Sequence, residues 1–264
     1  MLGKNSKNYH LLDGLIVFIP SLYDEIKIKK NRVNEVIFTG FWKDRISKNN
    51  TAIRALELMS AYVPDNFQIF IEKNIPVGSG LGGGSSNAGC IIKYFIAKYK
   101  IKIPSEKLLW ICNSIGADVA MFLFPKALYF NDTGDTLTQL EKIPPINIVI
   151  VYPQVVISTE QIYKFGFKKY NEKIPHKLFF ESQNQLIEFL KLTKNALYPN
   201  ALKIFPELKS LITAIEKNTG CLLARMTGSG SACFGIFNNI KNAKLGLKFL
   251  QKKFPNYSIY ISKI

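Results

Sequence analysis

A glycine-rich segment at residues 76–86, PVGSGLGGGSS, constrains this chain more than any other part of its sequence. Five of the seven residues from 78 to 84 are glycines, which leave backbone N–H groups uncovered and adopt the positive φ angles that turn them to one side. The segment follows an alternating apolar run at residues 67–72, typical of a strand, and leads into an apolar helical pattern over residues 85–99. A flexible linker would not be expected between two such elements.

The start of this helix predicts a cradle for a polyphosphate. The first turn of a helix carries N–H groups without intrahelical partners and the positive end of the helix dipole. Glycine amides before the helix and serine hydroxyls within it add donors to the same place. We expect a Cβ on Gly83 to stand where a phosphate approaches, with little effect on stability. The expected phosphate-binding residues are Pro76, Val77, Gly78, Ser79, Gly80, Leu81, Gly82, Gly83, Gly84, Ser85 and Ser86.

Three other nucleotide-binding loops do not fit. Gly78, Gly80 and Gly83 match G-x-G-x-x-G formally, but residues 98–102 hold no acidic residue where a dinucleotide fold expects its ribose ligand. A Walker A loop needs Lys and Ser or Thr after its last glycine, whereas Gly84 follows Gly83. The H-R-D and D-F-G motifs of protein kinases are absent.

The charge balance of 35 basic and 19 acidic residues, a net +16, favours an anionic partner. The lysines are spread along the chain and no nucleic-acid-binding motif accompanies them, so we expect a nucleotide and a small phosphorylated substrate rather than nucleic acid. A nucleic-acid-binding module stays open as an alternative. The apolar runs at residues 15–20 and 146–151 are far shorter than the roughly 20 residues of a membrane span, so no membrane partner is expected.

The four cysteines, at positions 90, 112, 221 and 233, form no C-x-x-C pair. That spacing indicates neither a zinc site nor a disulfide framework. Their apolar surroundings predict buried thiols that behave as small hydrophobes, and hence a reducing, cytoplasmic compartment.

The remaining pattern is that of a mixed α+β chain in two domains. Strands are expected at residues 11–18, 24–28, 127–131, 136–140, 146–152, 222–226, 233–237 and 257–262. Helices are expected at residues 50–62, 106–115, 183–192, 206–218 and 240–254, with Ser105 as an N-cap and Gly116 as a helix end. Pro144 and Pro145 predict a boundary between a first domain, residues 1–145, and a second, residues 146–264.

The glycine-rich segment resembles the P-x-G-x-G-L-G-G-G-S-S phosphate loop of the galactokinase, homoserine kinase, mevalonate kinase and phosphomevalonate kinase (GHMP) superfamily. Residues 116–119, GADV, and residues 227–234, TGSGSACF, resemble its short acidic motif and its C-terminal glycine motif. The resemblance implies a two-domain α+β fold with ATP and substrate sites in the cleft between the domains, and ATP with Mg²⁺ as cofactors. It does not identify the Mg²⁺ ligands.

Within that superfamily the sequence is most similar to the kinases of 4-diphosphocytidyl-2-C-methyl-D-erythritol in non-mevalonate isoprenoid biosynthesis, from residue 9 to nearly the end. The resemblance implies that Tyr9 and Tyr163 stack on cytosine and that His10 hydrogen-bonds its edge, and stacking is worth about 1–3 kcal/mol per base in other contexts. A core position is an equal alternative for Tyr163. The substrate-binding residues that the resemblance implies are Tyr9, His10, Thr159, Tyr163, Gly228, Ser229 and Gly230.

The reaction implied is transfer of the ATP γ-phosphoryl group to the 2-hydroxyl of the erythritol moiety, with Asp118 accepting or orienting the hydroxyl proton. The alternative role for Asp118 is structural, as a hydrogen-bond acceptor at the end of a helix. Homoserine or mevalonate-type kinase activity, or a nucleotide-binding chain without catalysis, also stay open.

The family's first strand, of the type Ala-Lys-Ile-Asn-Leu, places a lysine beside this aspartate. Residues 1–8 do not carry that pattern, and Lys4 and Lys7 are expected in a turn. We therefore expect weak turnover from the chain as given.

Overall fold

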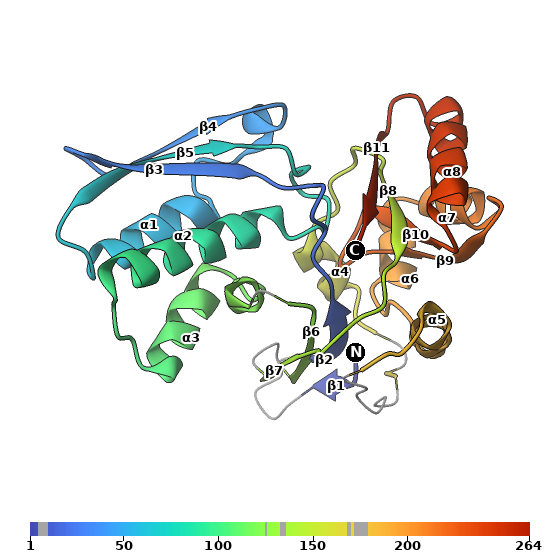
Figure 1. Ribbon diagram of the computed structural model, residues 1–264, viewed down its shortest axis with the longest axis horizontal. Coiled ribbons are helices and arrows are strands. Elements are labelled where there is room, and N and C mark those ends of the chain that lie inside the picture. Colours follow the sequence, from blue (N-terminus) through green and yellow to red (C-terminus); the bar gives the residue numbers. More distant parts are fainter. Residues whose placement is uncertain (5–9, 125, 133–135, 168–169, 172–178) are drawn as a thin grey trace.

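The computed structural model describes residues 1–4, 10–124, 126–132, 136–167, 170–171 and 179–264, which form two lobes with a smaller sheet between their lower parts (Figure 1). The strands are β1 Gly3–Lys4, β2 His10–Ile16, β3 Glu25–Asn31, β4 Glu35–Thr39, β5 Asn66–Glu72, β6 Leu128–Asp132, β7 Thr136–Gln139, β8 Asn147–Tyr152, β9 Cys221–Met226, β10 Cys233–Phe237 and β11 Ser258–Lys263. The helices are α1 Thr51–Ser60, α2 Gly83–Tyr99, α3 Ser105–Ile115, α4 Thr159–Lys164, α5 Gln183–Leu192, α6 Tyr198–Ile204, α7 Leu208–Glu216 and α8 Ile240–Lys253, with 3₁₀ turns η1 Lys43–Arg45 and η2 Ala120–Leu123.

The first lobe is a three-stranded sheet covered on one face by α1 and α2 (Figure 1). Its central strand, β5, pairs antiparallel with β3 and parallel with β4. Phe67, Ile69 and Ile71 alternate along β5 and are fully buried, because successive side chains of a strand point to opposite faces. They pack with the apolar faces of α1 and α2, which start side by side at the same end of the lobe.

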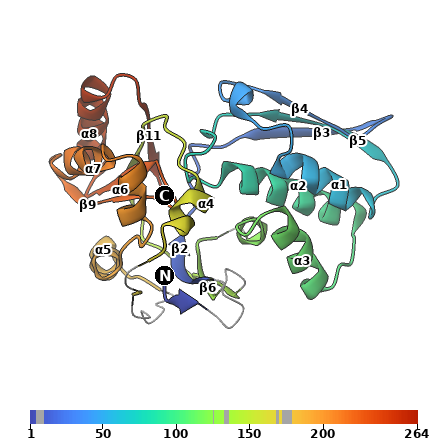
Figure 2. The same cartoon turned by 180° about the vertical axis from the view of Figure 1, so that it is seen from behind.

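The second lobe is an antiparallel sheet in the order β11-β8-β10-β9, packed against α7 and α8 (Figures 1 and 2). Five consecutive residues of β8, from Ile148 to Tyr152, are buried, which explains why this strand reads as a continuous apolar run. One face packs on α7 and α8, and the other contributes to a cluster around Trp42 from the first lobe.

The third sheet, in the order β1-β2-β6-β7, lies between the lower parts of the two lobes (Figure 1). The hairpin expected from residues 127–140 is present as the antiparallel pair of β6 and β7, and its turn lies outside the described residues. Lys4 pairs with His10 in a short strand. Its expected place in a turn is therefore wrong, while Lys7 lies outside the described residues.

Several local expectations need correction. Ser105 is the first residue of α3 and not its N-cap; Pro104 holds that position without a side-chain cap, whereas Gly116 ends the helix as expected. Strand β4 and helices α4 and α6 were not predicted, because each is short and weakly periodic. The boundary between residues 145 and 146 stays a prediction.

The cysteine expectation holds for Cys112 and Cys233, which are buried, but Cys90 is exposed and Cys221 is only partly buried. Cys90 lies on the side of α2 away from the sheet, since its neighbours Ile91 and Ile92 fill the core. All four thiols are free, in keeping with the absence of a disulfide pattern.

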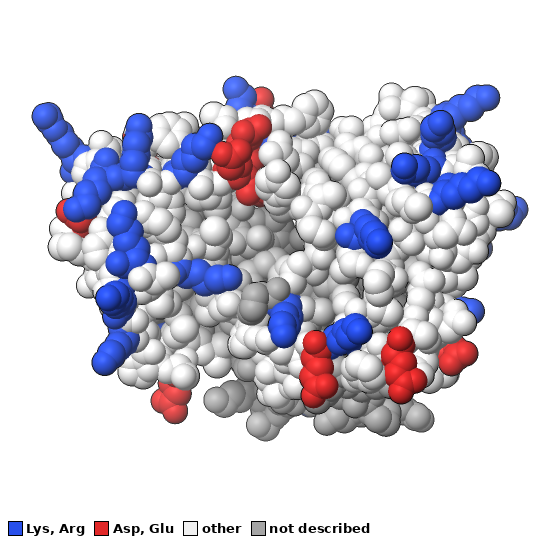
Figure 3. Space-filling view, viewed as in Figure 1, with Lys and Arg blue, Asp and Glu red and all other residues white. Residues whose placement is uncertain are grey.

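On the face shown in Figure 3, lysine and arginine side chains are distributed over both lobes rather than gathered in one patch. Within the described ranges, no helix has both the length and the apolar character needed to cross a membrane.

Candidate active site

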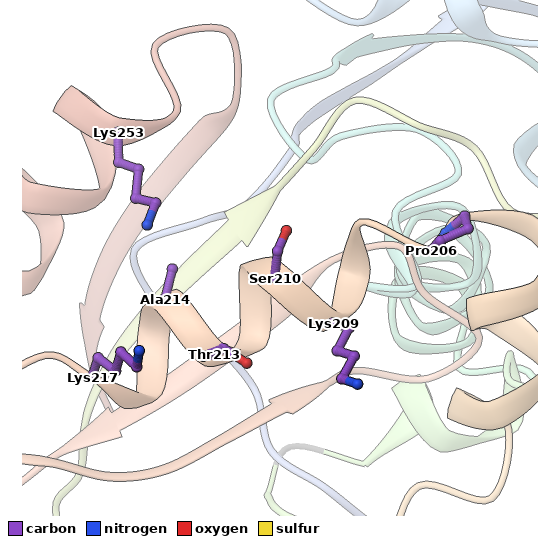
Figure 4. A pocket seen from close by; sticks show the side chains of 7 residues that line it. All are labelled: Pro206, Lys209, Ser210, Thr213, Ala214, Lys217 and Lys253. Carbon is purple, nitrogen blue, oxygen red and sulfur yellow. The ribbon is translucent and has the colours of Figure 1, made fainter.

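Two surface cavities of similar size lie in different parts of the molecule. One, of about 490 Å³, lies on α7 and is lined by Lys209, Lys217, Lys253 and four other residues (Figure 4). None of the residues that the sequence singles out lines it. The other, of about 500 Å³, is lined by residues 76–85 together with Asp118, Thr159 and Ser229. This second cavity, hereafter the cleft, is the candidate active site.

The glycine-rich segment forms the cleft wall in the conformation that its sequence predicts. Gly78, Gly80 and Gly82 have φ angles of 70°, 76° and 71°, a region that favours glycine. Gly82 is the N-cap of α2, so the helix starts at Gly83 and two residues earlier than expected. The first-turn amides of a 17-residue helix therefore open on the cleft.

The expectation that a side chain at Gly83 would have little effect on stability is wrong. A Cβ at this position would lie 2.8 Å from Ile75 Cγ2 and 3.5 Å from Lys73 Nζ, so it would meet protein atoms rather than open space. A larger residue at 83 would therefore strain the packing beneath the loop and lower stability.

A second helix begins at the same cleft. The Asn50 side chain caps α1 by accepting hydrogen bonds from the amides of Ala52 and Ile53, both at 3.1 Å. Thr51 Oγ1 donates to the Gly84 carbonyl over 2.7 Å and so ties the first turn of α1 to that of α2. Two helix N-termini thus direct positive partial charge at one cleft. The sequence indicated α1 but not its place beside the phosphate loop.

The loop is seated on the second lobe by apolar contacts and by backbone pairing. Val77 and Leu81 pack into the cluster around Trp42, which includes Tyr152 of β8. The Tyr152 hydroxyl donates to the Val77 carbonyl over 3.1 Å, and the Ala232 amide donates to the Ser79 carbonyl over 3.0 Å. The loop therefore bridges the two lobes.

The second glycine motif packs directly on the first. A Cβ on Gly80 would come within 2.8 Å of the carbonyl oxygens of Thr227 and Gly230, which explains why this contact requires glycine. Asn195 Nδ2 holds the motif by donating to the carbonyls of Met226 at 2.9 Å and Gly228 at 2.8 Å.

Of the residues expected to bind substrate, Thr159 and Ser229 line the cleft, and Thr159 Oγ1 donates to Ser229 Oγ over 2.8 Å. Gly228 and Gly230 do not line it but support Gly80 from behind. Ser86 likewise does not line it, and its amide bonds to the Gly82 carbonyl within α2.

Asp118 lies in the turn after α3 and lines the same cleft. Its side chain is open to solvent, yet the surrounding cleft walls limit hydration and raise the pKa of the carboxyl above its ordinary value. Across the described ranges no lysine or arginine forms an ion pair with it. The group is therefore available to accept a proton.

An aromatic cluster of His10, Tyr163 and Phe167 lies outside the residues that line the cleft. The ring centroids of His10 and Tyr163 lie 5.0 Å apart, and Phe167 lies 5.1 Å from His10 and 5.7 Å from Tyr163. Burial, and next the charge of Asp118, raise the pKa of Tyr163, so this ring is within electrostatic reach of the carboxylate. Tyr9 lies outside the described residues, and Phe167 was not predicted.

His10 carries a buried Nδ1 atom that has no hydrogen-bond partner among the described residues. Burial lowers the pKa of its imidazole most strongly and the Lys4 charge lowers it further, which favours the neutral ring. A neutral imidazole offers one donor and one acceptor, as recognition of a polar base edge requires.

The described residues include no cluster of three or more His, Cys, Asp or Glu side chains that could hold a metal ion. Asp118 is the one acidic residue among those lining the cleft. Mg²⁺ needs no more than this, because it commonly binds one or two carboxylates together with phosphate oxygens and water. The lining therefore fits a nucleotide-bound Mg²⁺ but no independent metal site.

Comparison with known proteins agrees with this fold. The description "GHMP kinases N terminal domain" matches residues 50–126, and "GHMP kinases C terminal" matches residues 175–256. A crystal structure of mevalonate kinase from L. major shares the fold, with a TM-score of 0.69 at 16% identity over 97% of this chain and 90% of its own. The protein is thus a kinase of the GHMP class, and ATP is its phosphoryl donor.

More similar proteins define the family within that class. The 4-diphosphocytidyl-2-C-methyl-D-erythritol kinases of Wolbachia sp. subsp. Brugia malayi and Ehrlichia ruminantium are 34% and 32% identical, over 97% and 100% of this chain and 91% and 94% of their own. A crystal structure of 4-(cytidine 5'-diphospho)-2C-methyl-D-erythritol kinase has a TM-score of 0.79 at 26% identity, covering 99% of this chain and 93% of that one. The chain belongs to the 4-diphosphocytidyl-2-C-methyl-D-erythritol kinase family.

Proposed function

We propose that this kinase phosphorylates the 2-hydroxyl of 4-diphosphocytidyl-2-C-methyl-D-erythritol with ATP, using Asp118 as the proton acceptor. The observation that carries the proposal is that the glycine loop and Asp118 line the same cleft, while the charge of Asp118 reaches Tyr163 of the His10–Tyr163–Phe167 cluster. These parts match the three parts of the reaction, which are a polyphosphate, a hydroxyl group and a flat polar base.

The polyphosphate of ATP binds across the N-termini of α1 and α2. Loop amides from residues 78–84 and the Ser85 hydroxyl donate hydrogen bonds to its oxygens, and the two helix dipoles favour its negative charge. Thr159 and Ser229 bound the cleft beside the loop and help to position the groups that react.

Asp118 accepts the proton of the 2-hydroxyl as the oxygen attacks the γ-phosphorus. The bond between the γ-phosphorus and the β,γ-bridging oxygen breaks, and ADP leaves with the bonding electron pair. Positioning and charge neutralisation supply most of the acceleration in phosphoryl transfer. When bound with the nucleotide, Mg²⁺ would neutralise charge on the transferring phosphates, and the Ser85 hydroxyl is the oxygen ligand that the cleft would offer it, since Asp118 is assigned to the proton.

The cytosine of the substrate lies against Tyr163, and its polar edge meets the neutral imidazole of His10. Phe167 adds a third ring to this wall. Tyr9 is proposed as the second stacking platform. The partners are thus ATP and a cytidyl substrate rather than nucleic acid or a membrane, and four free thiols favour a reducing cytoplasm.

The decisive experiment measures ADP release and phosphorylated product with 4-diphosphocytidyl-2-C-methyl-D-erythritol, homoserine and mevalonate as separate acceptors. We expect turnover with the cytidyl acceptor alone and competitive inhibition by cytidine nucleotides. Replacement of His10 by Ala should raise KM for the cytidyl acceptor while KM for ATP stays constant. Equal turnover with homoserine or mevalonate, or insensitivity to cytidine nucleotides, would contradict the substrate assignment.

A further inference from the structure

A buried ion pair beneath the glycine loop has no part in the mechanism described above. Asp24 and Lys73 pair with side chains that are 1% and 4% exposed, whereas the other ion pairs among the described residues lie on the surface. Asp24 Oδ2 accepts from Lys73 Nζ. Its other oxygen, Oδ1, accepts from the backbone amides of Asn74 at 2.7 Å and Ile75 at 2.8 Å. One carboxylate thus holds an ammonium and two amides.

These groups lie where the chain leaves β5 for the glycine loop. The Lys73 amide donates to the Thr39 carbonyl at the end of β4, and the Lys73 carbonyl accepts from the Trp42 amide. Asn74 and Ile75 follow directly, and the loop begins at Pro76. Asp24 immediately precedes β3. Its bonds to residues 73–75 therefore hold the start of the glycine loop against the neighbouring strand.

Lys73 also lines the cleft, close to the start of α2. Its Nζ lies 3.5 Å from the position of a Cβ on Gly83, the first residue of that helix. A cation is unfavourable beside a helix N-terminus, so the Asp24 carboxylate is needed to keep the ammonium there. Asp24 is its one hydrogen-bond partner among the described residues, which leaves the rest of its three N–H donors for a ligand.

A buried ion pair contributes little net stability compared with an apolar pair of the same volume. Its position at the wall of an anion-binding cleft therefore points to a role in the bound state. We propose that Asp24 is a positioning residue of the nucleotide site: it holds the Lys73 ammonium and the Asn74–Ile75 amides in the arrangement that ATP binding requires. This inference rests on the proposed function for the identity of the nucleotide.

The test separates ATP binding from stability with two variants and a control. Asp24→Asn keeps the shape but removes the charge that holds Lys73. We expect the dissociation constant and KM for ATP to rise about tenfold, a tenfold change being 1.4 kcal/mol, with kcat altered less than KM. The control, Asp65→Asn, removes the acid of the Lys30–Asp65 pair, which lies beside the same sheet but does not line the cleft, and should leave both constants unchanged.

The double variant Asp24→Asn with Lys73→Met removes both charges but keeps an Oδ1 acceptor for the Asn74 and Ile75 amides, and should stay close to the melting temperature of the unaltered chain. ATP binding should stay about tenfold weaker in this variant. Recovery of both melting temperature and ATP affinity would overturn the proposal and leave the pair a purely structural contact. The double variant decides alone if Asp24→Asn does not fold. Failure of the unaltered chain to bind ATP would instead contradict the proposed function.

Discussion

At the residue scale, the central feature is a carboxylate that faces a phosphate-binding loop without a cationic partner among the described residues. Asp118 lines the cleft and has a raised pKa because the cleft walls limit its hydration. A bound nucleotide and acceptor would therefore face an unneutralised carboxylate, since no described lysine or arginine forms an ion pair with Asp118.

Replacement of Asp118 by Asn should therefore remove proton acceptance and preserve shape. We expect kcat to fall by about 100-fold or more, the scale of general-base loss, with little change in KM for either substrate. Steady-state kinetics with both substrates varied measures this. Turnover near that of the unaltered chain would remove Asp118 from the mechanism.

The raised pKa of Asp118 also predicts a pH dependence. A base acts when deprotonated, so kcat should rise with pH through this pKa and then level off, with an acidic limb above the range of an ordinary aspartate near pH 3.9. The folded state binds this proton more tightly than the unfolded state, so the contribution of Asp118 to stability falls as pH rises through the raised pKa. Asp118→Asn should accordingly not lower the melting temperature at neutral pH, and a clear drop would count against the raised pKa.

At the element scale, the cleft is built from helix starts. Asn50 caps α1 beside the glycine loop, whereas Asn239 caps α8 by accepting from the Asn242 amide in the second lobe. The two caps are chemically alike, but only Asn50 lines the cleft. They therefore offer a matched comparison of a stabilising role with a binding role.

Replacement of either asparagine by Ala should cost about 1 kcal/mol of unfolding free energy, since each helix loses its cap. Only Asn50→Ala should also raise the dissociation constant for ATP, because it disturbs the amides that open on the cleft. Urea unfolding and ATP titration of both variants measure this. An equal change of ATP affinity in both would argue that stability alone governs binding.

At the scale of the whole molecule, the apolar cluster around Trp42 joins the two lobes and packs against the glycine loop. Trp42 packs on Tyr152 with ring centroids 5.7 Å apart, and Arg45 Nη1 donates to the Gln154 carbonyl over 3.2 Å. Val77 and Leu81 of the loop belong to the same cluster. A change that weakens packing in the Trp42 cluster should therefore also weaken nucleotide binding.

Trp42→Phe should lower the unfolding free energy by about 1–3 kcal/mol through loss of buried contacts, and should weaken ATP binding as well. The control is Phe67→Leu, a similar loss in the core of the first lobe away from the cleft. It should lower stability without changing ATP affinity. The ATP-dependent rise in melting temperature measures both effects, and an unaltered rise in Trp42→Phe would show that the joint does not support the site.

The sequence by itself determined the elements and the chemistry that are local. Positive φ at Gly78, Gly80 and Gly82, the helix that follows, the alternation of β5 and the end of α3 at Gly116 all depend on near neighbours along the chain. The family motifs likewise occupy short contiguous runs. Long periodic elements such as α5 and α8 were therefore predicted closely, while short ones such as β4 and α4 were not.

Only the tertiary structure decided which residues meet. The pairing of Asp24 with Lys73 joins positions 49 residues apart, and the contact of Gly80 with residues 227–230 joins the two glycine motifs. The same packing turned Gly83 toward Ile75, exposed Cys90 and placed Phe167 against His10. Periodicity states which face of an element is apolar, but the partner of that face is set by packing between distant segments, which no local pattern encodes.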